Sequence, residues 1–142
     1  MEIRRATSAD AAVLECFWKE STAELDFTPY PGAAWEESLL AEHVALVAED
    51  GEEPVGAVYA NLAMEHFGYV FGLYVRPEAR RRGIAQALMR AIAAVLHDEG
   101  REYMLLSVDI PNTPALELYE RLGFEDASRM LRIETARLLE DA

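Results

Sequence analysis

The most informative segment of the sequence is VRPEARRRGIAQALM, residues 75–89. It follows FGYVFGLYV at 67–75, a run rich in aromatic and β-branched residues that is typical of a strand. Pro77 ends this strand because proline cannot donate to a sheet ladder. From Gly83 the pattern becomes helical and continues to a glycine stop at Gly100. The apolar face of that helix is formed by Ile84, Leu88, Ala91, Ile92 and Val95.

Shorter elements are predicted before this unit. Residues 2–5 form a short strand, and Thr7 or Ser8 caps a helix. The apolar stripe of that helix is Leu14, Phe17, Trp18 and Leu25. A second short helix is predicted at 35–42. The runs VALVAE and PVGAVYANL, separated by a turn with Asp50 and Gly51, predict a hairpin.

The remaining elements follow the central helix. YMLLSVD at 103–109 is typical of a buried strand. Asn112 caps a further helix that has Pro114 in its first turn and ends at Gly123, and one or two closing strands are expected from Phe124 onward.

This order of elements predicts the fold class. A strand, a helix and another strand imply a parallel pair joined by a right-handed crossover, whereas the hairpin implies antiparallel partners. We expect an α+β fold, or α/β by some conventions, with a mixed, mostly antiparallel sheet and helices on both faces. Because there is no repeat or linker, residues 1–142 are expected to form a single domain.

Composition narrows the function. The chain has 142 residues, 13 basic and 26 acidic, and a formal charge of −13, which opposes binding to nucleic acid. Its single cysteine, Cys16, excludes a disulfide framework and a four-cysteine zinc site, so no metal is expected. No stretch approaches a membrane span or the apolar core of a signal peptide. We therefore expect a cytoplasmic protein that does not bind membranes.

Positive charge gathers at the turn between the strand and the helix. Arg76, Arg80, Arg81 and Arg82 lie within seven positions. The unpaired amides and the dipole at a helix start attract anions, and Gly83 would let a phosphate approach the main chain. The alternative is a solvated basic loop. Neither GxxxxGK[ST] nor G-x-G-x-x-G occurs in the chain, which argues against those two modes of nucleotide binding.

Two motifs carry a resemblance to a known family. RRRGIA at 80–85 is similar to the R/Q-x-x-G-x-G/A motif of the GNAT superfamily of N-acetyltransferases, and it follows a strand ending in LYV and a proline. NTPALELYERLGF at 112–124 resembles the second motif of that family. The two motifs stand in the family's order with one strand between them. The resemblance extends over nearly the whole chain.

The resemblance implies an enzyme that transfers the acetyl group of acetyl-CoA to a primary amine. In the family, two parallel strands splay apart and the pantetheine arm of the coenzyme lies between them like an added strand. By position, the coenzyme would be bound by Leu73, Tyr74, Val75, Arg80, Arg81, Arg82, Gly83, Ile84, Ala85, Gln86, Asn112 and Tyr119. Asn112 is equally well explained as a helix cap.

Tyr119 is the predicted general acid. It lies seven positions after Asn112, so both side chains are on one face of the predicted helix. A phenol with a pKa of about 10 is protonated at neutral pH and can donate to the departing thiolate. The alternative is that Tyr119 simply packs against Leu118 and Leu122. Because Cys16 falls inside the first helix without an evident histidine partner, no covalent intermediate is expected.

The general base is less well defined. Some family members use a glutamate on the first splayed strand, but residues 67–75 contain no carboxylate, and Ser107 stands where the ribosomal-protein N-terminal acetyltransferases have one. Asp109 is the candidate from the second strand. Flanking loops offer Glu24, Asp26, Glu65 and His66, and a chain of water molecules is equally acceptable.

The acceptor is expected to be a small-molecule amine, a peptide N-terminus or a lysine. The predicted wall residues of its pocket are Asp26, Phe27, Tyr30, Trp35 and Tyr59, although ordinary packing explains the aromatic ones as well. A homodimer is left open, since family members often pair. Two other functions compete with the enzyme: a non-catalytic acyl-CoA sensor or adaptor, and a binding module for another anionic ligand.

Overall fold

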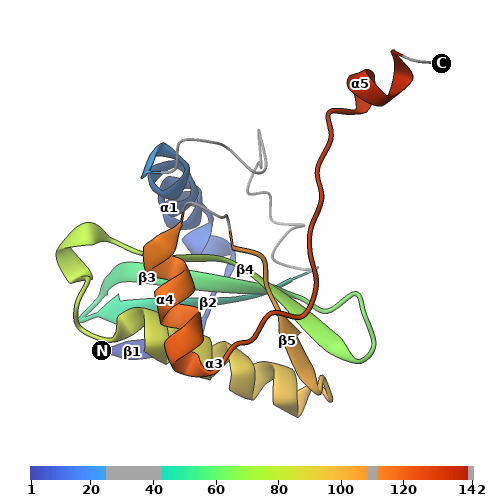
Figure 1. The fold of residues 1–142 in the computed structure, drawn as a ribbon. Coiled ribbons are helices and arrows are strands. Elements are labelled where there is room, and N and C mark those ends of the chain that lie inside the picture. Colours follow the sequence, from blue (N-terminus) through green and yellow to red (C-terminus); the bar gives the residue numbers. More distant parts are fainter. Residues whose placement is uncertain (25–42, 109–111, 141–142) are drawn as a thin grey trace. The chain divides into compact units, whose positions relative to one another are not determined.

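The computed structural model describes residues 1–24, 43–108 and 112–140. The chain divides into two compact units, Met1–Leu106 and Ser107–Ala142. Figure 1 labels the helices and strands of each unit. The predicted helix at 35–42 and the predicted stripe residue Leu25 lie outside the described residues. No helix of the described part is long and apolar enough to cross a membrane.

The first unit contains a five-stranded sheet in the order β1-β2-β3-β4-β5. Its strands are β1 (Glu2–Arg5), β2 (His43–Asp50), β3 (Glu53–Asn61), β4 (Phe67–Val75) and β5 (Tyr103–Leu105). All neighbouring pairs are antiparallel except β4 and β5, which are parallel. The predicted hairpin and the mixed, mostly antiparallel sheet are therefore confirmed.

The parallel pair is short. The ladder joins Phe67–Tyr69 of β4 to Tyr103–Leu105 of β5. The predicted strand at 103–109 is therefore too long, because its pairing with β4 stops at Leu105. β4 itself continues to Val75, so its second half has no β5 partner among the described residues.

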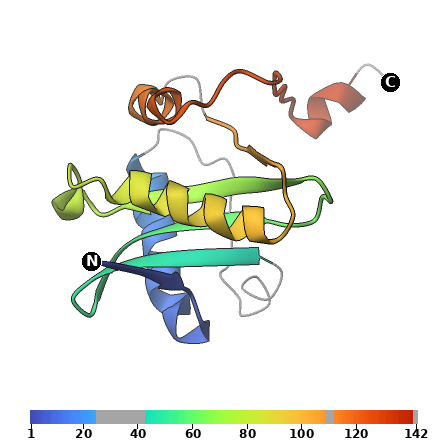
Figure 2. The ribbon, with the colours of Figure 1, turned by 90° about the horizontal axis from the view of Figure 1, so that it is seen from below.

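Helices cover both faces of the sheet, as predicted (Figure 2). A short 3-10 turn, η1 (Ser8–Asp10), leads into α1 (Ala11–Glu24), which buries Leu14 and Phe17 against Tyr59 and Tyr74. On the other face lies α3 (Ile84–Asp98), which follows the 3-10 turn η2 (Pro77–Ala79). Its side chains Leu88 and Leu96 pack over sheet glycines, where a methyl group would lie within 3.3 Å of them.

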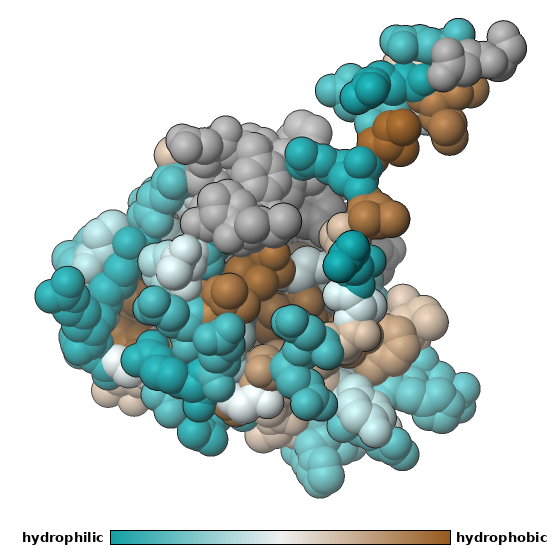
Figure 3. Space-filling model, in the orientation of Figure 1, coloured by the Kyte–Doolittle hydropathy of each residue, from teal (hydrophilic) through white to brown (hydrophobic). Residues whose placement is uncertain are grey.

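The second unit contains α4 (Thr113–Leu122) and α5 (Thr135–Leu139). Asn112 caps α4 by accepting a hydrogen bond from the Ala115 amide at 3.4 Å, and Gly123, with φ +97°, ends it, as predicted. The expected closing strands are wrong: residues 124–134 form no strand, because the described part of this unit offers no strand edge for pairing. Met130 and Leu131 of this segment are exposed. Figure 3 shows hydrophobic residues between hydrophilic ones along the C-terminal part of the chain. The following TARLL is helical, in keeping with its good helix formers.

Candidate active site

β4 changes register halfway along its length. On β3, Ala57 and Tyr59 are two residues apart, but their partners on β4, Tyr74 and Phe71, are three apart. The extra residue is a β-bulge at Gly72, whose φ of +66° favours glycine. A Cβ atom at this position would lie 2.4 Å from Cδ2 of Tyr59. This bulge was not predicted from the sequence, although a glycine inside a strand pattern is the usual signal for one.

Beyond the bulge, one edge of β4 pairs with no strand in the part of the chain that the structure describes, and we call it the open edge. The Arg76 amide donates to the Val55 carbonyl of β3 at 2.8 Å, and the Tyr74 carbonyl also lies against β3 at Gly56. Because alternate residues of an antiparallel strand face the same neighbour, the peptide groups of Val75 point away from β3. They point to the side where the ladder with β5 has already ended. Of the predicted main-chain donors and acceptors, Leu73 lies at the bulge and Val75 on this edge.

The start of α3 lies directly after this edge. Gly83 is the N-cap, with φ +77°, and Arg81 before it also has a positive φ of +64°. The Ala87 amide closes the first turn on the Gly83 carbonyl at 3.0 Å. The amides of residues 84–86 have no acceptor within the helix, as in any first turn. A Cβ at Gly83 would meet nothing within 4 Å, so the space beside these amides is open.

Two of the three adjacent arginines form ion pairs in the described structure. Arg80 donates through Nη2 to both carboxylate oxygens of Glu24 at 2.8 Å, and through Nε to the Val75 carbonyl at 2.9 Å. Arg82 bonds to Asp50, the last residue of β2, at 2.8 Å. This bond lowers the pKa of the Asp50 carboxyl. Arg81 is exposed.

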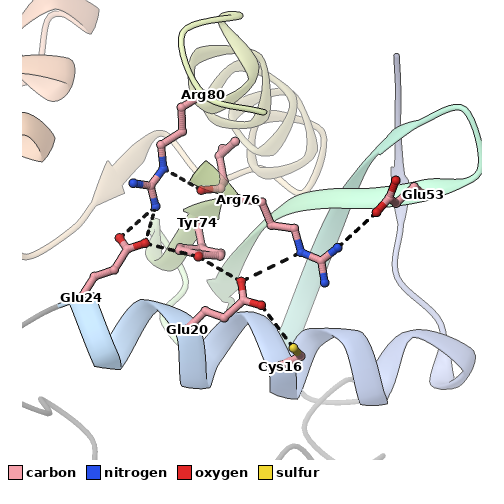
Figure 4. A network of polar contacts seen from close by, with 8 residues as sticks. Cys16, Glu20, Glu24, Glu53, Tyr74, Arg76 and Arg80 are labelled. Carbon is pink, nitrogen blue, oxygen red and sulfur yellow. Dashed lines mark hydrogen bonds and ion pairs between the residues drawn. The ribbon is translucent and has the colours of Figure 1, made fainter. Parts of the chain in front are cut away.

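A polar network that sequence reasoning missed joins α1 to the end of β4 (Figure 4). The Tyr74 hydroxyl lies 3.0 Å from Oε2 of Glu20 and 3.4 Å from Oε1 of Glu24. Burial, and then the hydrogen bond to Glu20, raises the pKa of the Tyr74 phenol. Glu20 also accepts from the Cys16 thiol at 3.3 Å and lies 3.9 Å from the Arg76 guanidinium. The signal was the spacing of Cys16, Glu20 and Glu24, four residues apart on one helix face.

Aromatic side chains near the bulge lie on the face of the sheet that α1 covers. Tyr59 is buried and stacks on Phe71, with ring centroids 5.4 Å apart. His43 meets the Phe71 ring edge-on, also at 5.4 Å. Nδ2 of Asn61 lies 3.3 Å from Nε2 of His43, while Oδ1 of Asn61 accepts the Ala63 amide. His43 and Asn61 were also missed, since neither belongs to a recognisable motif.

Tyr119 and Asn112 lie in the second unit. The Tyr119 ring packs against Phe124, with centroids 5.6 Å apart, and its carbonyl accepts the Phe124 amide at 3.0 Å. Burial raises the pKa of the Tyr119 phenol, so the group is protonated at neutral pH. Oδ1 of Asn112 is used in the helix cap, which leaves the Nδ2 hydrogens of the side chain as donors.

The remaining predicted residues are the candidate bases and the residues of the acceptor pocket, and several of them lie outside the described part of the chain. Glu24 is held in an ion pair, and Ser107 contacts Met130. Glu65 and His66 lie in the turn before β4, roughly 20 Å from the bulge at about 3.3 Å per strand residue. Asp26, Phe27, Tyr30, Trp35 and Asp109 lie outside the described residues. Residues 1–24, 43–108 and 112–140 contain no group of His, Cys, Asp or Glu that could hold a metal ion.

Comparison with known proteins identifies the family. Residues 11–124 match the model of the acetyltransferase (GNAT) family. The chain belongs to the GNAT family. It is 33% identical to N-alpha-acetyltransferase 30 of Xenopus laevis over 93 residues, which cover 63% of this chain and 34% of that protein. The chain thus matches about a third of the length of this relative.

Solved structures support the GNAT fold. A GCN5-related N-acetyltransferase from Ralstonia eutropha JMP134 superposes with a TM-score of 0.78 at 23% identity, over 94% of this chain and 97% of that one. A predicted acetyltransferase from Clostridium acetobutylicum, solved with acetyl-CoA, gives a TM-score of 0.77 at 16% identity, over 96% and 97% of the two chains.

Proposed function

We propose that this GNAT chain transfers the acetyl group of acetyl-CoA to a primary amine, as a single acyltransferase domain over residues 1–142. The observation that carries the proposal is the continuous path formed by the open half of β4 and the start of α3. This path offers strand peptide groups, then arginines, then free helix amides around Gly83. An extended arm that ends in a diphosphate matches that order of groups.

The residues of the first unit would bind the donor. The main chain at Leu73 and Val75 would pair with the pantetheine amides as an added strand does. The first-turn amides of Ile84, Ala85 and Gln86 would bind the diphosphate, with Arg81 and Arg82 neutralising its charge. For Arg82 this requires sharing or releasing its partner Asp50. From the second unit, Nδ2 of Asn112 would donate to a carbonyl of the arm.

The chemistry would be a direct transfer. The neutral amine nitrogen attacks the thioester carbonyl carbon, a C–N bond forms, the C–S bond breaks, and the sulfur leaves as a thiolate. Tyr119 would donate a proton to that thiolate, which its raised pKa permits at neutral pH. The proton lost by the amine would pass to water or to Asp109. Main-chain amides at the bulge would polarise the carbonyl oxygen.

The acceptor is proposed to be a cationic amine of a small molecule, or the N-terminus or a lysine of a peptide. The charge of −13 favours such a partner, and the name of the Xenopus relative indicates an N-terminal amine for that protein. Asp26, Phe27, Tyr30 and Trp35 remain the proposed contacts. A cytoplasmic location is also proposed, because a chain with a single cysteine needs no oxidising compartment.

A screen for acetylated products tests this function. The protein and acetyl-CoA are incubated with mixed amines, polyamines, amino acids and peptides, while mass spectrometry follows a gain of one acetyl group and a thiol reagent follows free CoA. We expect one class of amine to gain acetyl in step with thiol release. Thiol release without any acetylated amine, or no CoA binding at all, would contradict the proposal.

An acyl-CoA sensor is the second candidate, and one observation favours it. β4 carries no carboxylate, and Phe71 and Tyr74 face the α1 core from the part of the strand around the bulge. A sensor would bind CoA in calorimetry and yet acetylate no amine in the screen.

A further inference from the structure

Arg80 is held by three hydrogen bonds from two of its nitrogen atoms. Nε donates to the Val75 carbonyl at 2.9 Å, and Nη2 donates to Oε1 and Oε2 of Glu24 at 2.8 Å each (Figure 4). Its guanidinium carbon also lies 5.6 Å from the centroid of the Tyr74 ring. The flat guanidinium therefore joins the end of α1 to the end of β4.

The carbonyl that Arg80 contacts is part of the open edge. Since the Val75 peptide groups point away from β3, its carbonyl faces the side on which the coenzyme is proposed to lie. An unpaired edge carbonyl would be free to reorient or to bind water. The bond from Arg80 fixes the direction of the strand at its last residue, directly before the turn that leads to Gly83.

Glu24 is fixed in turn by the network on α1. Tyr74 donates to Glu20 at 3.0 Å, four residues before Glu24 on the same helix, and the Tyr74 hydroxyl lies 3.4 Å from Glu24. The Arg80 and Glu24 side chains are 42% and 43% exposed. An ion pair that exposed contributes little to stability by itself. The arrangement is better suited to orienting a group than to stabilising the fold.

We propose that Glu24 and Arg80 form a positioning pair: Glu24 orients the guanidinium, and Arg80 holds the Val75 end of the open β4 edge in the geometry that the coenzyme arm requires. This inference rests on the proposed function. It assigns Arg80 mainly to the protein backbone, and it leaves the diphosphate to Arg81, Arg82 and the amides at the start of α3.

A second ion pair provides a matched control. Arg82 and Asp50 are also 2.8 Å apart, and their side chains are 47% and 45% exposed, but neither contacts the β4 edge in a described hydrogen bond. E24Q and D50N each remove one carboxylate charge from an arginine of the same loop. Only E24Q is expected to disturb the β4 edge.

The experiment measures the dissociation constant of CoA by calorimetry for the full chain and its E24Q, R80Q, R80K, D50N and E24Q/R80Q variants, with thermal unfolding recorded for each. We expect E24Q and R80Q to weaken CoA binding about tenfold, the size of one lost charge-assisted hydrogen bond. The double variant is expected to be no weaker than R80Q. R80K is expected to fail to restore binding, since lysine lacks the planar fork. D50N is expected to bind CoA at least as tightly as the parent.

Several results would contradict the proposed positioning role of Glu24 and Arg80. Restored affinity in R80K would show that Arg80 supplies only positive charge, and additive losses in the double variant would show that the two residues act separately. Equal affinity of E24Q and D50N would remove the role of Glu24. If the parent chain failed to bind CoA, the proposed function would fall together with the pair. Binding by the parent and unchanged binding by E24Q would overturn the pair alone.

Discussion

The two halves of β4 differ in what their backbone does. Phe67–Tyr69 pairs with β5, and Tyr69 at its end also pairs with Asn61 of β3. From Val70 to Val75 the strand keeps β3 as a neighbour, contains the bulge at Gly72, and has no β5 partner among the described residues. The proposed coenzyme site therefore depends on a strand that is paired along only part of one edge. Such an edge needs no special residue types, because its main-chain groups would make the contacts.

The largest effects are expected from substituting the glycines in the two halves of β4. A Cβ at Gly72 would lie 2.4 Å from Tyr59, and one at Gly68 would lie 2.4 Å from Leu96. Gly72→Ala adds backbone strain at φ +66°, so it should lower the free energy of unfolding by about 2–4 kcal/mol, against about 1–3 kcal/mol for Gly68→Ala. Denaturant unfolding measures both.

The CoA affinity of the two folded variants should then distinguish the two halves of β4. Below the unfolding temperature, Gly68→Ala is expected to bind CoA as the parent does, whereas Gly72→Ala is expected to lose most of its CoA affinity because the bulge is displaced. Equal CoA affinities in calorimetry would show that the bulge has no part in binding.

Tyr119→Phe is expected to have the next largest effect, on chemistry alone. Removal of the proposed general acid should lower kcat about 100-fold, and CoA binding should change little because no charge is lost. Steady-state kinetics with the best amine from the screen, beside a CoA titration, give both values. An unchanged kcat would leave Tyr119 as a packing residue against Phe124.

Gly83→Asp tests the continuation of the open edge into α3. It would place a negative charge beside the first-turn amides, and we expect CoA affinity to fall about tenfold. Gly100→Asp is the matched control: Gly100 has the same φ of +77° and open space around it, but lies past the opposite end of α3. If both variants weakened CoA binding equally, a local role of the Gly83 amides would be refuted.

The smallest functional effect is expected at Asp10, remote from β4. This buried carboxylate accepts two hydrogen bonds from Arg4, at 2.8 and 2.9 Å, and one from the Thr7 amide at 2.7 Å. The Arg4 bonds, above all, lower the pKa of the Asp10 carboxyl. Its contribution to stability is therefore present above the unfolded pKa of about 3.9 and is lost as pH falls below that value.

Asp10→Asn should accordingly lower the free energy of unfolding by about 1–3 kcal/mol at pH 7. The difference from the parent should shrink below about pH 4. CoA affinity is expected to stay unchanged. Urea unfolding at several pH values measures the first two effects, and a constant difference down to pH 2 would contradict the assignment to Asp10.

The sequence predicted the parts of this molecule that depend on local patterns. The helix from Ile84, its glycine start and the cap at Asn112 follow from capping and spacing rules, and they are found as expected. The early end of β5 and the lack of strands in residues 124–140 were not predictable in this way, because a strand exists only where a neighbour pairs with it.

The candidate site likewise contains residues that a local motif predicted and contacts that no local pattern could predict. Gly83 and the arginines were found from a contiguous motif. The contacts among Glu20, Glu24, Tyr74 and Arg80 join residues up to 56 positions apart, so only the fold reveals them. Tyr74 was predicted for its main chain, yet its carbonyl faces β3 and its hydroxyl serves the network on α1.

The most direct test of the central claim is amide hydrogen exchange of the full chain with and without CoA, resolved by NMR. CoA is expected to slow exchange at the amides of residues 72–75 and 83–86, while residues 67–69, already paired with β5, change little. Protection by CoA elsewhere in the chain, with these two segments unaffected, would contradict the claim that the open half of β4 and the start of α3 bind the coenzyme.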